Sequence, residues 1–420
     1  MIFARAHLND PALEAARFLH RLAFIILMIV APIGEVASHG LLYVLFPVGV
    51  AVFVIAGLLA GGEQALRRII VAFLSTIGMG VAFLAFWSGL SLIWTLFPGE
   101  AVARLARTLL TAGMALLAIV SLPERTKISN IYLLPMGVAI TAAATLLMIF
   151  FGPDSFREGP NPDYILAQRC VMSLAILLWP ALGALALRDH FIIAAGLAII
   201  VAAATLASFL PIALAAMMGA ALTYVAAMTN PLRVARIMAA VFAIVLLGAP
   251  LFVAFLYPIV AVANLSFGGA FGVFSSLVVH EWPRFITGHG LDMVERAMDL
   301  GLLPPDTPQS IVFVLWYELG VVGVAGFVFL LTAILLATAR LALHVAPAFL
   351  AVLAAFLIIA FFGAETTQLW WMTLNGVAAI AIALLIKAHP RSKRPPAPAA
   401  HQETEAEAEE MGEPYPEPDF

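Results

Sequence analysis

The chain contains a single cysteine and few charged residues. Cys170 has no second cysteine with which to form an internal disulfide, and Asp, Glu, Lys and Arg make up 11% of the 420 residues. No group of His, Cys, Asp or Glu has metal-ligand spacing, so we expect no metal and no other cofactor. The first 20 residues lack an early apolar run before a small-residue cleavage site, and we therefore expect no cleaved signal peptide. The scarcity of charge argues against a soluble fold and against a nucleic-acid partner.

Apolar residues take the place of the missing charge. They account for 63% of the chain, and the mean hydropathy of +1.06 is typical of a polytopic membrane protein. Stretches of about 17–25 apolar residues are long enough to cross the roughly 30 Å hydrocarbon layer as helices. Because lipid offers no hydrogen-bond partners to the backbone, the predicted fold class is all-α. We predict about twelve transmembrane helices, at 23–38, 41–60, 69–94, 108–122, 131–151, 166–187, 191–208, 211–229, 238–257, 310–336, 346–364 and 370–387.

The distribution of basic residues predicts the orientation. With both termini cytoplasmic, 15 of the 21 Lys and Arg residues, including all three lysines, fall in inner segments, as the positive-inside rule requires. An alternative for the first two spans is a re-entrant pair around Pro32 and Glu35. The six basic residues left on the outer, periplasmic side are all arginines: Arg104, Arg107, Arg157, Arg169, Arg284 and Arg296.

Three regions follow from this topology. Residues 1–22 are predicted to form a cytoplasmic N-terminus, and residues 23–388 the membrane domain. Residues 389–420 begin with a basic stop and continue Pro-rich and Glu-rich, which predicts a disordered cytoplasmic tail. Inside the membrane domain, a large periplasmic loop of about fifty residues, 258–309, joins the ninth and tenth spans. It is too apolar for disorder, and we expect it to cap the helices with a short amphipathic helix at 291–302. The loop at 152–165 is expected to close the same cavity.

The outer arginines differ in what surrounds them in the sequence. Arg169 lies about one turn inside the sixth span, where an unpaired guanidinium is costly, so it needs an anion. That anion is either a substrate phosphate or an acidic side chain such as Asp154 or Asp163. Arg284 comes just before Gly288-His289-Gly290, where glycines allow backbone amides to approach a ligand.

The remaining outer arginines have simpler interpretations. We attribute Arg104 and Arg107 to snorkelling toward lipid head groups. Arg157 and Arg296 have acidic neighbours in the sequence and are interpreted as solvated ion pairs.

The most specific motif opens the tenth span. Gln309 and Ser310 are followed by nine residues and then by Gly320-Val321-Val322-Gly323, with Trp316, Glu318 and Leu319 before the first glycine. This stretch resembles the O-antigen ligase family of membrane glycosyltransferases, whose pattern is His, then Asn, Ser or Gln, nine residues and Gly-x-x-Gly. Over about residues 40–388, further stretches resemble that family: Gln168-Arg169, Leu178 to Ala181, Thr205 to Ser208, Gly288 to Leu291 and Gln368 to Trp371.

The resemblance implies a reaction at the periplasmic face of the bacterial inner membrane. A glycan linked to undecaprenyl pyrophosphate is transferred to an acceptor hydroxyl, on the lipid A core or on a growing glycan, and undecaprenyl pyrophosphate leaves. Membrane lipids surround the protein. Guanidinium groups form bidentate, charge-assisted hydrogen bonds with phosphate, and we therefore predict that Arg169 and Arg284 bind the pyrophosphate without a metal.

The sequence departs from the family at the histidine that is thought to act on the acceptor hydroxyl. Gln309 stands there, and an amide orients a hydroxyl but does not take its proton at neutral pH. Candidate replacements in the outer region are His280, His289, Glu281, Asp292 and Asp306. His289 is the first choice and Asp306 the second, each weighed against a structural role in a loop or turn. We expect Glu318 to pair inside the bundle. Supporting roles are predicted for Ser310, Gly288, Gly290, Glu318, Gly320 and Gly323, the last two as sites of close helix packing.

Other functions stay open at this stage. The missing histidine mildly favours a polysaccharide polymerase of the same superfamily. A transporter or lipid-linked glycan flippase is expected to show an internal repeat and charged or broken helices near the midplane, and the sequence shows no repeat and few such charges. An inactive scaffold for other assembly proteins is a further alternative.

Overall fold

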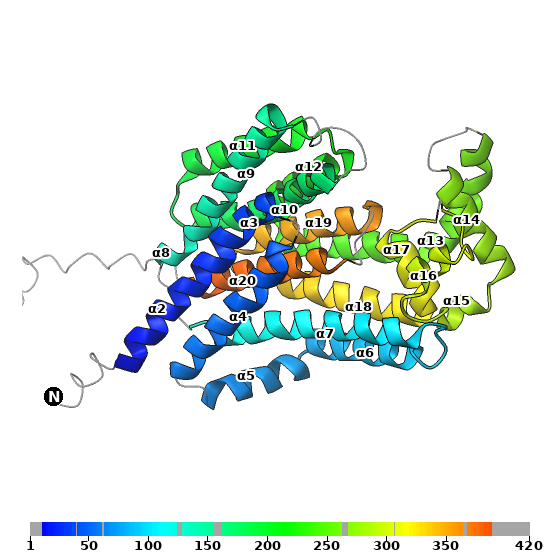
Figure 1. Ribbon diagram of the computed structural model, residues 1–420, viewed down its shortest axis with the longest axis horizontal. Coiled ribbons are helices and arrows are strands. Elements are labelled where there is room, and N and C mark those ends of the chain that lie inside the picture. The colour runs from blue at the N-terminus through cyan, green and yellow to red at the C-terminus, as the bar shows by residue number, and fades with distance from the viewer. Residues whose placement is uncertain are drawn as a thin grey trace, which may run out of the picture. The chain divides into compact units, whose positions relative to one another are not determined.

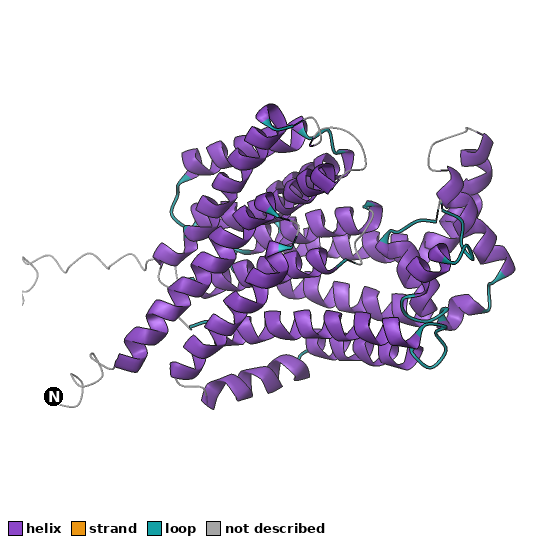
Figure 2. Ribbon diagram, in the orientation of Figure 1, coloured by secondary structure: helices purple, strands orange, loops and turns teal. Residues whose placement is uncertain are grey.

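The described part of the chain is helical throughout. A computed structural model describes residues 11–38, 40–60, 63–123, 128–153, 156, 162–262, 268–305, 307–363 and 368–388. Within these residues every regular element is a helix (Figure 2), which confirms the all-α prediction. The predicted tail at 389–420, and Asp154, Arg157 and Asp306, lie outside the described residues.

Most helices are α-helices, and two short segments, η2 and η4, are π-helical (Figure 1). In chain order they are α2 (Pro11–Ile25), η2 (Ile26–Val30), α3 (Ala31–Ala37), α4 (Leu41–Leu59), α5 (Glu63–Leu74), α6 (Thr76–Ser91), α7 (Pro98–Ser121), α8 (Ile128–Ile131), α9 (Leu133–Phe151), α10 (Pro162–Ala186), α11 (Phe191–Ala207), α12 (Pro211–Thr229), α13 (Pro231–Val262), α14 (Gly268–His280), α15 (Arg284–Thr287), α16 (Met293–Asp299), α17 (Ile311–Val314), η4 (Leu315–Leu319), α18 (Gly320–Thr338), α19 (Ala346–Phe362) and α20 (Leu369–Lys387).

The lengths of these helices confirm a multi-pass membrane protein. Among the described residues, nine helical paths are long and apolar enough to cross a membrane, and α5 and α6, bent by 76° at Ser75, form a tenth candidate. Helices α11 and α19 are apolar but 17 residues long. Each predicted segment therefore overlaps a helix, and the total of about twelve spans stays a prediction.

Four of the predicted starts are wrong in the same way. The first helical path begins at Pro11 instead of residue 23, α5 at Glu63 instead of 69, α7 at Pro98 instead of 108 and α13 at Pro231 instead of 238. Hydropathy placed each start after basic residues, whereas the helix continues through them. The path from Pro11 to Ala37 is one candidate span of 27 residues, and α4 packs against α2. This arrangement supports two successive spans over the re-entrant alternative.

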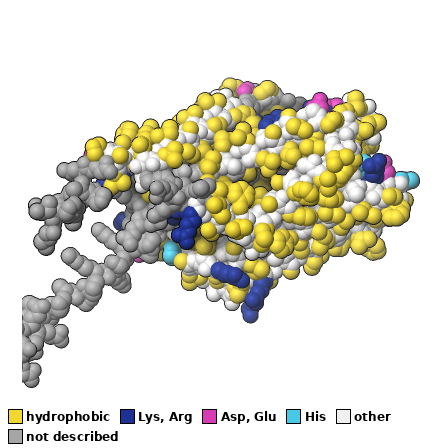
Figure 3. Space-filling view, turned by 90° about the horizontal axis from the view of Figure 1, so that it is seen from below, with side chains coloured by type: hydrophobic (Ala, Val, Ile, Leu, Met, Phe, Trp, Pro, Cys, Tyr) yellow, Lys and Arg dark blue, Asp and Glu magenta, His cyan; other side chains and the backbone are white. Residues whose placement is uncertain are grey.

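Helices α10 and α20 form the centre of the membrane domain. In the most apolar stretch of α10 and of α20, 83% and 72% of the residues are buried, whereas the corresponding value for α7 is 11%. Much of the remaining surface is apolar, as Figure 3 shows for one face, where charged side chains occur in a few small groups. Apolar side chains can face outward at little cost when the surrounding solvent is lipid.

The segment predicted to cap the helices is itself helical. It contains the end of α13 and all of α14, α15 and α16, which lie together at one end of the longer helices, on the right of Figure 1. Helix α16 falls within the predicted amphipathic helix at 291–302. We call residues 268–305 the cap.

Candidate functional site

The helix that carries the family-like motif is broken inside that motif. Helix α17 passes into the π-helical turn η4, and Gly320 then adopts a φ of 63° before α18 begins. A π-helical turn followed by a left-handed residue interrupts the ladder of helical hydrogen bonds. The carbonyl groups of Tyr317, Glu318 and Leu319 therefore need partners from outside the helix.

Those partners come from the Gly-His-Gly segment and from α6. The backbone amides of His289 and Gly290 donate to the carbonyl oxygens of Tyr317 and Glu318 at 2.8 and 3.0 Å. The indole nitrogen of Trp87 donates to the carbonyl oxygen of Leu319 at 2.9 Å. The prediction that these amides approach a ligand is therefore wrong, because they stabilise the break in the helix.

The glycines of both segments are required by this close approach. Gly288 has a φ of 78°, and a Cβ there would lie 2.1 Å from the carbonyl oxygen of Glu318. A Cβ on Gly320 would lie 2.6 Å from the amide nitrogen of Gly288, and one on Gly290 would lie 2.7 Å from Cα of Thr95. A Cβ on Gly320 would also lie 2.6 Å from the carbonyl oxygen of Ile286 on α15, so Gly320 permits the close helix packing that we predicted, against α15 and the residue that follows it. At Gly323 the nearest atoms belong to Leu319 of the preceding turn.

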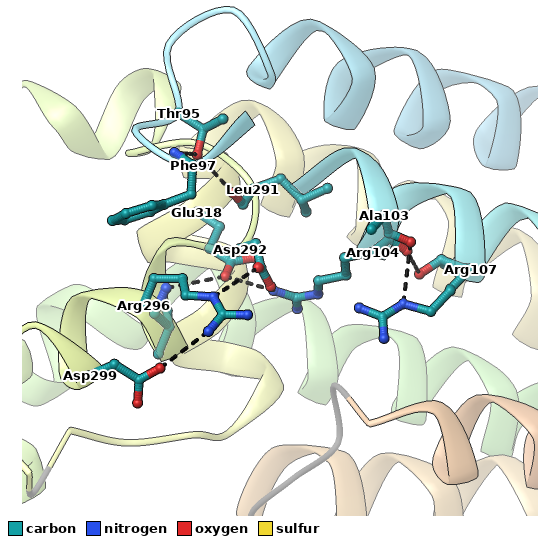
Figure 4. A network of polar contacts seen from close by, with 12 residues as sticks. Thr95, Phe97, Ala103, Arg104, Arg107, Leu291, Asp292, Arg296, Asp299 and Glu318 are labelled. Atoms are coloured by element: carbon teal, nitrogen blue, oxygen red, sulfur yellow. Dashed lines mark hydrogen bonds and ion pairs between the residues drawn. The ribbon is translucent and has the colours of Figure 1, made fainter. Parts of the chain in front are cut away.

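Arg104 is held by two acidic side chains at the break. Its Nη1 lies 2.9 and 3.1 Å from the two carboxylate oxygens of Glu318 and 3.3 Å from Oδ1 of Asp292 (Figure 4). The Arg104 side chain is 14% exposed and that of Glu318 is 2% exposed. The prediction that Glu318 pairs inside the bundle is confirmed. Snorkelling of Arg104 is wrong, since so enclosed a guanidinium needs its counter-charges.

The same network attaches the cap to α7. Nη1 of Arg296 lies 3.3 Å from Asp299, its Nε lies 3.8 Å from Asp292, and the Arg296 side chain is partly exposed, as predicted for a solvated pair. The hydroxyl of Thr95, between α6 and α7, donates to the carbonyl oxygen of Leu291 at 2.9 Å. The cap is therefore fixed to the membrane helices by charge and by hydrogen bonds.

A polar cavity of about 240 Å³ opens beside Arg104. Arg104 and Arg107 belong to α7 and point to the same side of it (Figure 4), while Asp292 and Glu295 come from the cap. A neighbouring, mostly apolar cavity of about 170 Å³ shares Arg104, Thr108 and Met372 with it. The polar cavity is also lined by Tyr43, Thr108, Gln368, Leu369 and Met372.

Arg107 and Arg169 relate to this cavity in different ways. Arg107 is exposed, and its Nε donates to the carbonyl oxygen of Ala103 on its own helix at 3.2 Å, so its guanidinium is accessible at the cavity wall. Arg169 donates from Nη2 to the amide oxygen of Gln368, and its guanidinium lies over the ring of Trp370, 5.2 Å from the centroid. Arg169 therefore does not line the cavity itself, but it orients Gln368, which does.

The structure places the other predicted site residues outside the lining of the polar cavity. Arg284 lies on α15 with an exposed side chain. The side-chain amide of Gln309 contacts Sδ of Met298 at 3.9 Å, and Ser310 caps α17 by accepting from the amide of Phe313 at 3.5 Å. These positions give Gln309 and Ser310 a role at the junction between α16 and α17.

His289 has both ring nitrogens occupied. Nε2 lies 2.7 Å from a carboxylate oxygen of Glu281, Nδ1 lies 3.1 Å from the carbonyl oxygen of Tyr317, and the ring stacks on Tyr317 with centroids 4.1 Å apart. A carboxylate and a carbonyl oxygen both accept hydrogen bonds. When both contacts are made, His289 has no free lone pair with which to take a proton.

Sequence reasoning named Asp292 as a lesser candidate base and Gln368 within a family-like stretch, but it gave Glu295 no role at a site and misassigned Arg104. The available signal was the spacing: Arg104 and Arg107 are three residues apart on one helix, and residues at i and i+3 share a helix face. Asp292 and Glu295 have the same spacing, but Asp292 precedes α16. That signal predicts a basic helix face, but it does not show which acidic residues meet it.

A separate, more apolar cavity of about 440 Å³ lies where α9 and α11 end and α10 begins. It is lined by Phe150, Phe156, Tyr164, Gln168 and Phe209, among others. Gln168 is the neighbour of Arg169 in one of the family-like stretches. The size and apolar lining suit a hydrocarbon chain.

The described residues contain no group of three or more His, Cys, Asp or Glu side chains placed to hold a metal ion. In comparisons with known proteins, no family model, no curated protein and no solved structure matches the chain. The resemblance to the O-antigen ligase family therefore stays a prediction, based on the order and spacing of its short motifs.

Proposed function

We propose that this chain is a membrane glycan transferase that moves a saccharide from undecaprenyl pyrophosphate to an acceptor hydroxyl, in the manner of the O-antigen ligase family. One observation carries the proposal. The two most specific family-like segments, Gly288 to Leu291 and Trp316 to Gly323, contact each other, and their junction lies beside a polar cavity that two arginines line.

The chemistry of the cavity fits this reaction. The bond between the saccharide and the pyrophosphate breaks as negative charge develops on the leaving group. Arg104 and Arg107 present guanidinium groups at the cavity, where preorganised donors stabilise such charge. Arg169 contributes through Gln368, and Arg284, on the exposed surface of the cap, remains a candidate for contact with the donor outside the cavity.

The placement of basic residues supports a periplasmic site in an inner membrane. At the C-terminal end of α7, His20, Arg68 and Lys387 bond to the carbonyl oxygens of Ser121, Val120 and Leu122. Arg104 lies 17 residues before Ser121 on α7, about 25 Å away at 1.5 Å per residue, close to the thickness of the hydrocarbon layer. With the basic end cytoplasmic, the cavity lies near the opposite face.

Deletion of the gene tests the proposal and separates its two forms. Lipopolysaccharide and exopolysaccharide are profiled by gel electrophoresis and mass spectrometry in the deletion strain and in the complemented strain. A core without long glycan indicates a ligase, whereas a core that carries one repeat indicates a polymerase, which Gln309 at the family's histidine position favours. Unchanged profiles contradict both forms and turn attention to a flippase or a scaffold.

A further inference from the structure

The polar cavity has two walls of opposite charge. Arg104 and Arg107 form the wall on α7, and Asp292 and Glu295 form the wall on the cap. A pyrophosphate binds favourably to the two arginines. The two carboxylates repel it and suit a neutral group that donates hydrogen bonds, such as a sugar hydroxyl. From this division we infer that Glu295 is the general base that takes the proton of the acceptor hydroxyl, an inference that rests on the proposed transfer reaction.

The two other carboxylates near the cavity, those of Glu318 and Asp292, are buried against guanidinium groups. Glu318 uses both oxygens to bind Nη1 of Arg104 and is 1% exposed. Asp292 is buried between Arg104 and Arg296, 3.3 and 3.8 Å away. A buried carboxylate that guanidinium groups hold is a poor acceptor for a substrate proton.

Glu295 differs from both in its exposure. It lies on the first turn of α16, three residues after Asp292, which precedes the helix, and its side chain is exposed and lines the cavity. It also lies close enough to Arg104 to interact with it electrostatically. A hydroxyl bound in the cavity therefore reaches a carboxylate on one side while an anion lies against guanidinium groups on the other.

The step balances without a co-reactant. The acceptor hydroxyl gives its proton to the carboxylate of Glu295 as its oxygen bonds to the anomeric carbon of the donor sugar. The bond from that carbon to the pyrophosphate oxygen breaks, and its electron pair stays on the pyrophosphate, beside Arg104 and Arg107. Glu295 then passes its proton to water. Both ring nitrogens of His289 already contact oxygen atoms of the protein, and Gln309 has no basic group.

The test uses purified full-length protein and a natural donor. If the proposed function holds, the deletion strain accumulates the lipid-linked glycan, which is extracted and supplied with an acceptor from the same strain. We expect Glu295→Gln to lower the turnover number about 10²- to 10⁴-fold, the usual contribution of a general base. We expect Glu295→Asp to keep part of the activity, because it keeps a carboxylate. Affinity for undecaprenyl pyrophosphate should stay within about threefold of wild type in both variants, since the base does not bind the leaving group.

The control is Asp299→Asn, which removes an exposed carboxylate from the same helix but outside the cavity lining. It should transfer glycan at the wild-type rate. Near-wild-type turnover by Glu295→Gln overturns the assignment of the base, and so does an equal loss in Asp299→Asn. Absence of donor accumulation on gene deletion instead refutes the proposed function, so the two failures are distinguishable.

Discussion

At the scale of single residues, Arg104 contributes most to both the structure and the site. One nitrogen of its guanidinium contacts two carboxylates, and the more enclosed of these, Glu318, also accepts from the amide of Val294 at 3.4 Å. Charges in such surroundings are stable only as a paired set. The pair thus serves two purposes: it joins α7 to the broken helix, and it places a guanidinium at the cavity.

Loss of one member of this pair should be costly. Removing one partner of a buried ion pair typically lowers stability by about 3–5 kcal/mol, and we expect Glu318→Leu to lower the free energy of unfolding by that amount. Arg104→Met combined with Glu318→Leu should regain part of the loss, because neither charge of this pair is then buried alone and Asp292 keeps Arg296 at 3.8 Å. Unfolding in SDS or by heating in detergent measures both variants. A single substitution that leaves the unfolding midpoint unchanged contradicts the pairing.

At the scale of elements, the central feature is the break at η4 and Gly320. The sequence predicted one uninterrupted span there, since every residue from Ile311 to Gly323 except Glu318 suits a membrane helix. Hydropathy does not detect the break, because a π-helical turn and a left-handed glycine change the backbone and not the composition. The contacts that stabilise the break come from residues far away in the sequence, such as Trp87, 232 residues from Leu319.

Trp87→Phe isolates one of these contacts. The substitution keeps an aromatic ring but removes the donor to the carbonyl oxygen of Leu319. A buried carbonyl without a partner costs about 1–3 kcal/mol, and we expect the free energy of unfolding to fall by that amount. Trp94→Phe is the matched control, because the buried indole nitrogen of Trp94 has no hydrogen-bond partner among the described residues. Equal stability of the two variants contradicts this account of the break.

At the scale of the whole molecule, the sequence predicted the helical class and the approximate position of every long apolar helix from a single property, hydropathy, but not the shorter apolar helix α14. It did not predict the site. The segments that line the cavity belong to α4, α7, α16 and α20, and Arg104 lies 214 residues from Glu318. The spacing of the motifs indicated which residues of the cap and of α17 to α18 lie near the site. It gave no information on which distant helix supplies the positive charge that pairs with Glu318.

Orientation in the membrane is tested by cysteine labelling. The native Cys170 is buried and is first replaced by Ala. Gly99, at the cavity end of α7, has open space around its Cα, and Arg340 is exposed just after α18. In whole cells an impermeant thiol reagent should modify Gly99→Cys, and it should modify Arg340→Cys only after the inner membrane is opened. The reverse pattern contradicts a periplasmic site.

The central claim is that the guanidinium wall of the cavity binds the diphosphate of a carrier lipid. The most direct measurement is the affinity of the purified protein for undecaprenyl pyrophosphate, compared between wild type and Arg107→Gln. Arg107 is exposed and hydrogen-bonded within its own helix, so the substitution should leave stability unchanged. A hydrogen bond to a charged group contributes about 1.5–3 kcal/mol, which predicts affinity about 10- to 100-fold weaker in the variant. Equal affinity in the two proteins, or no binding by wild type, would contradict the account.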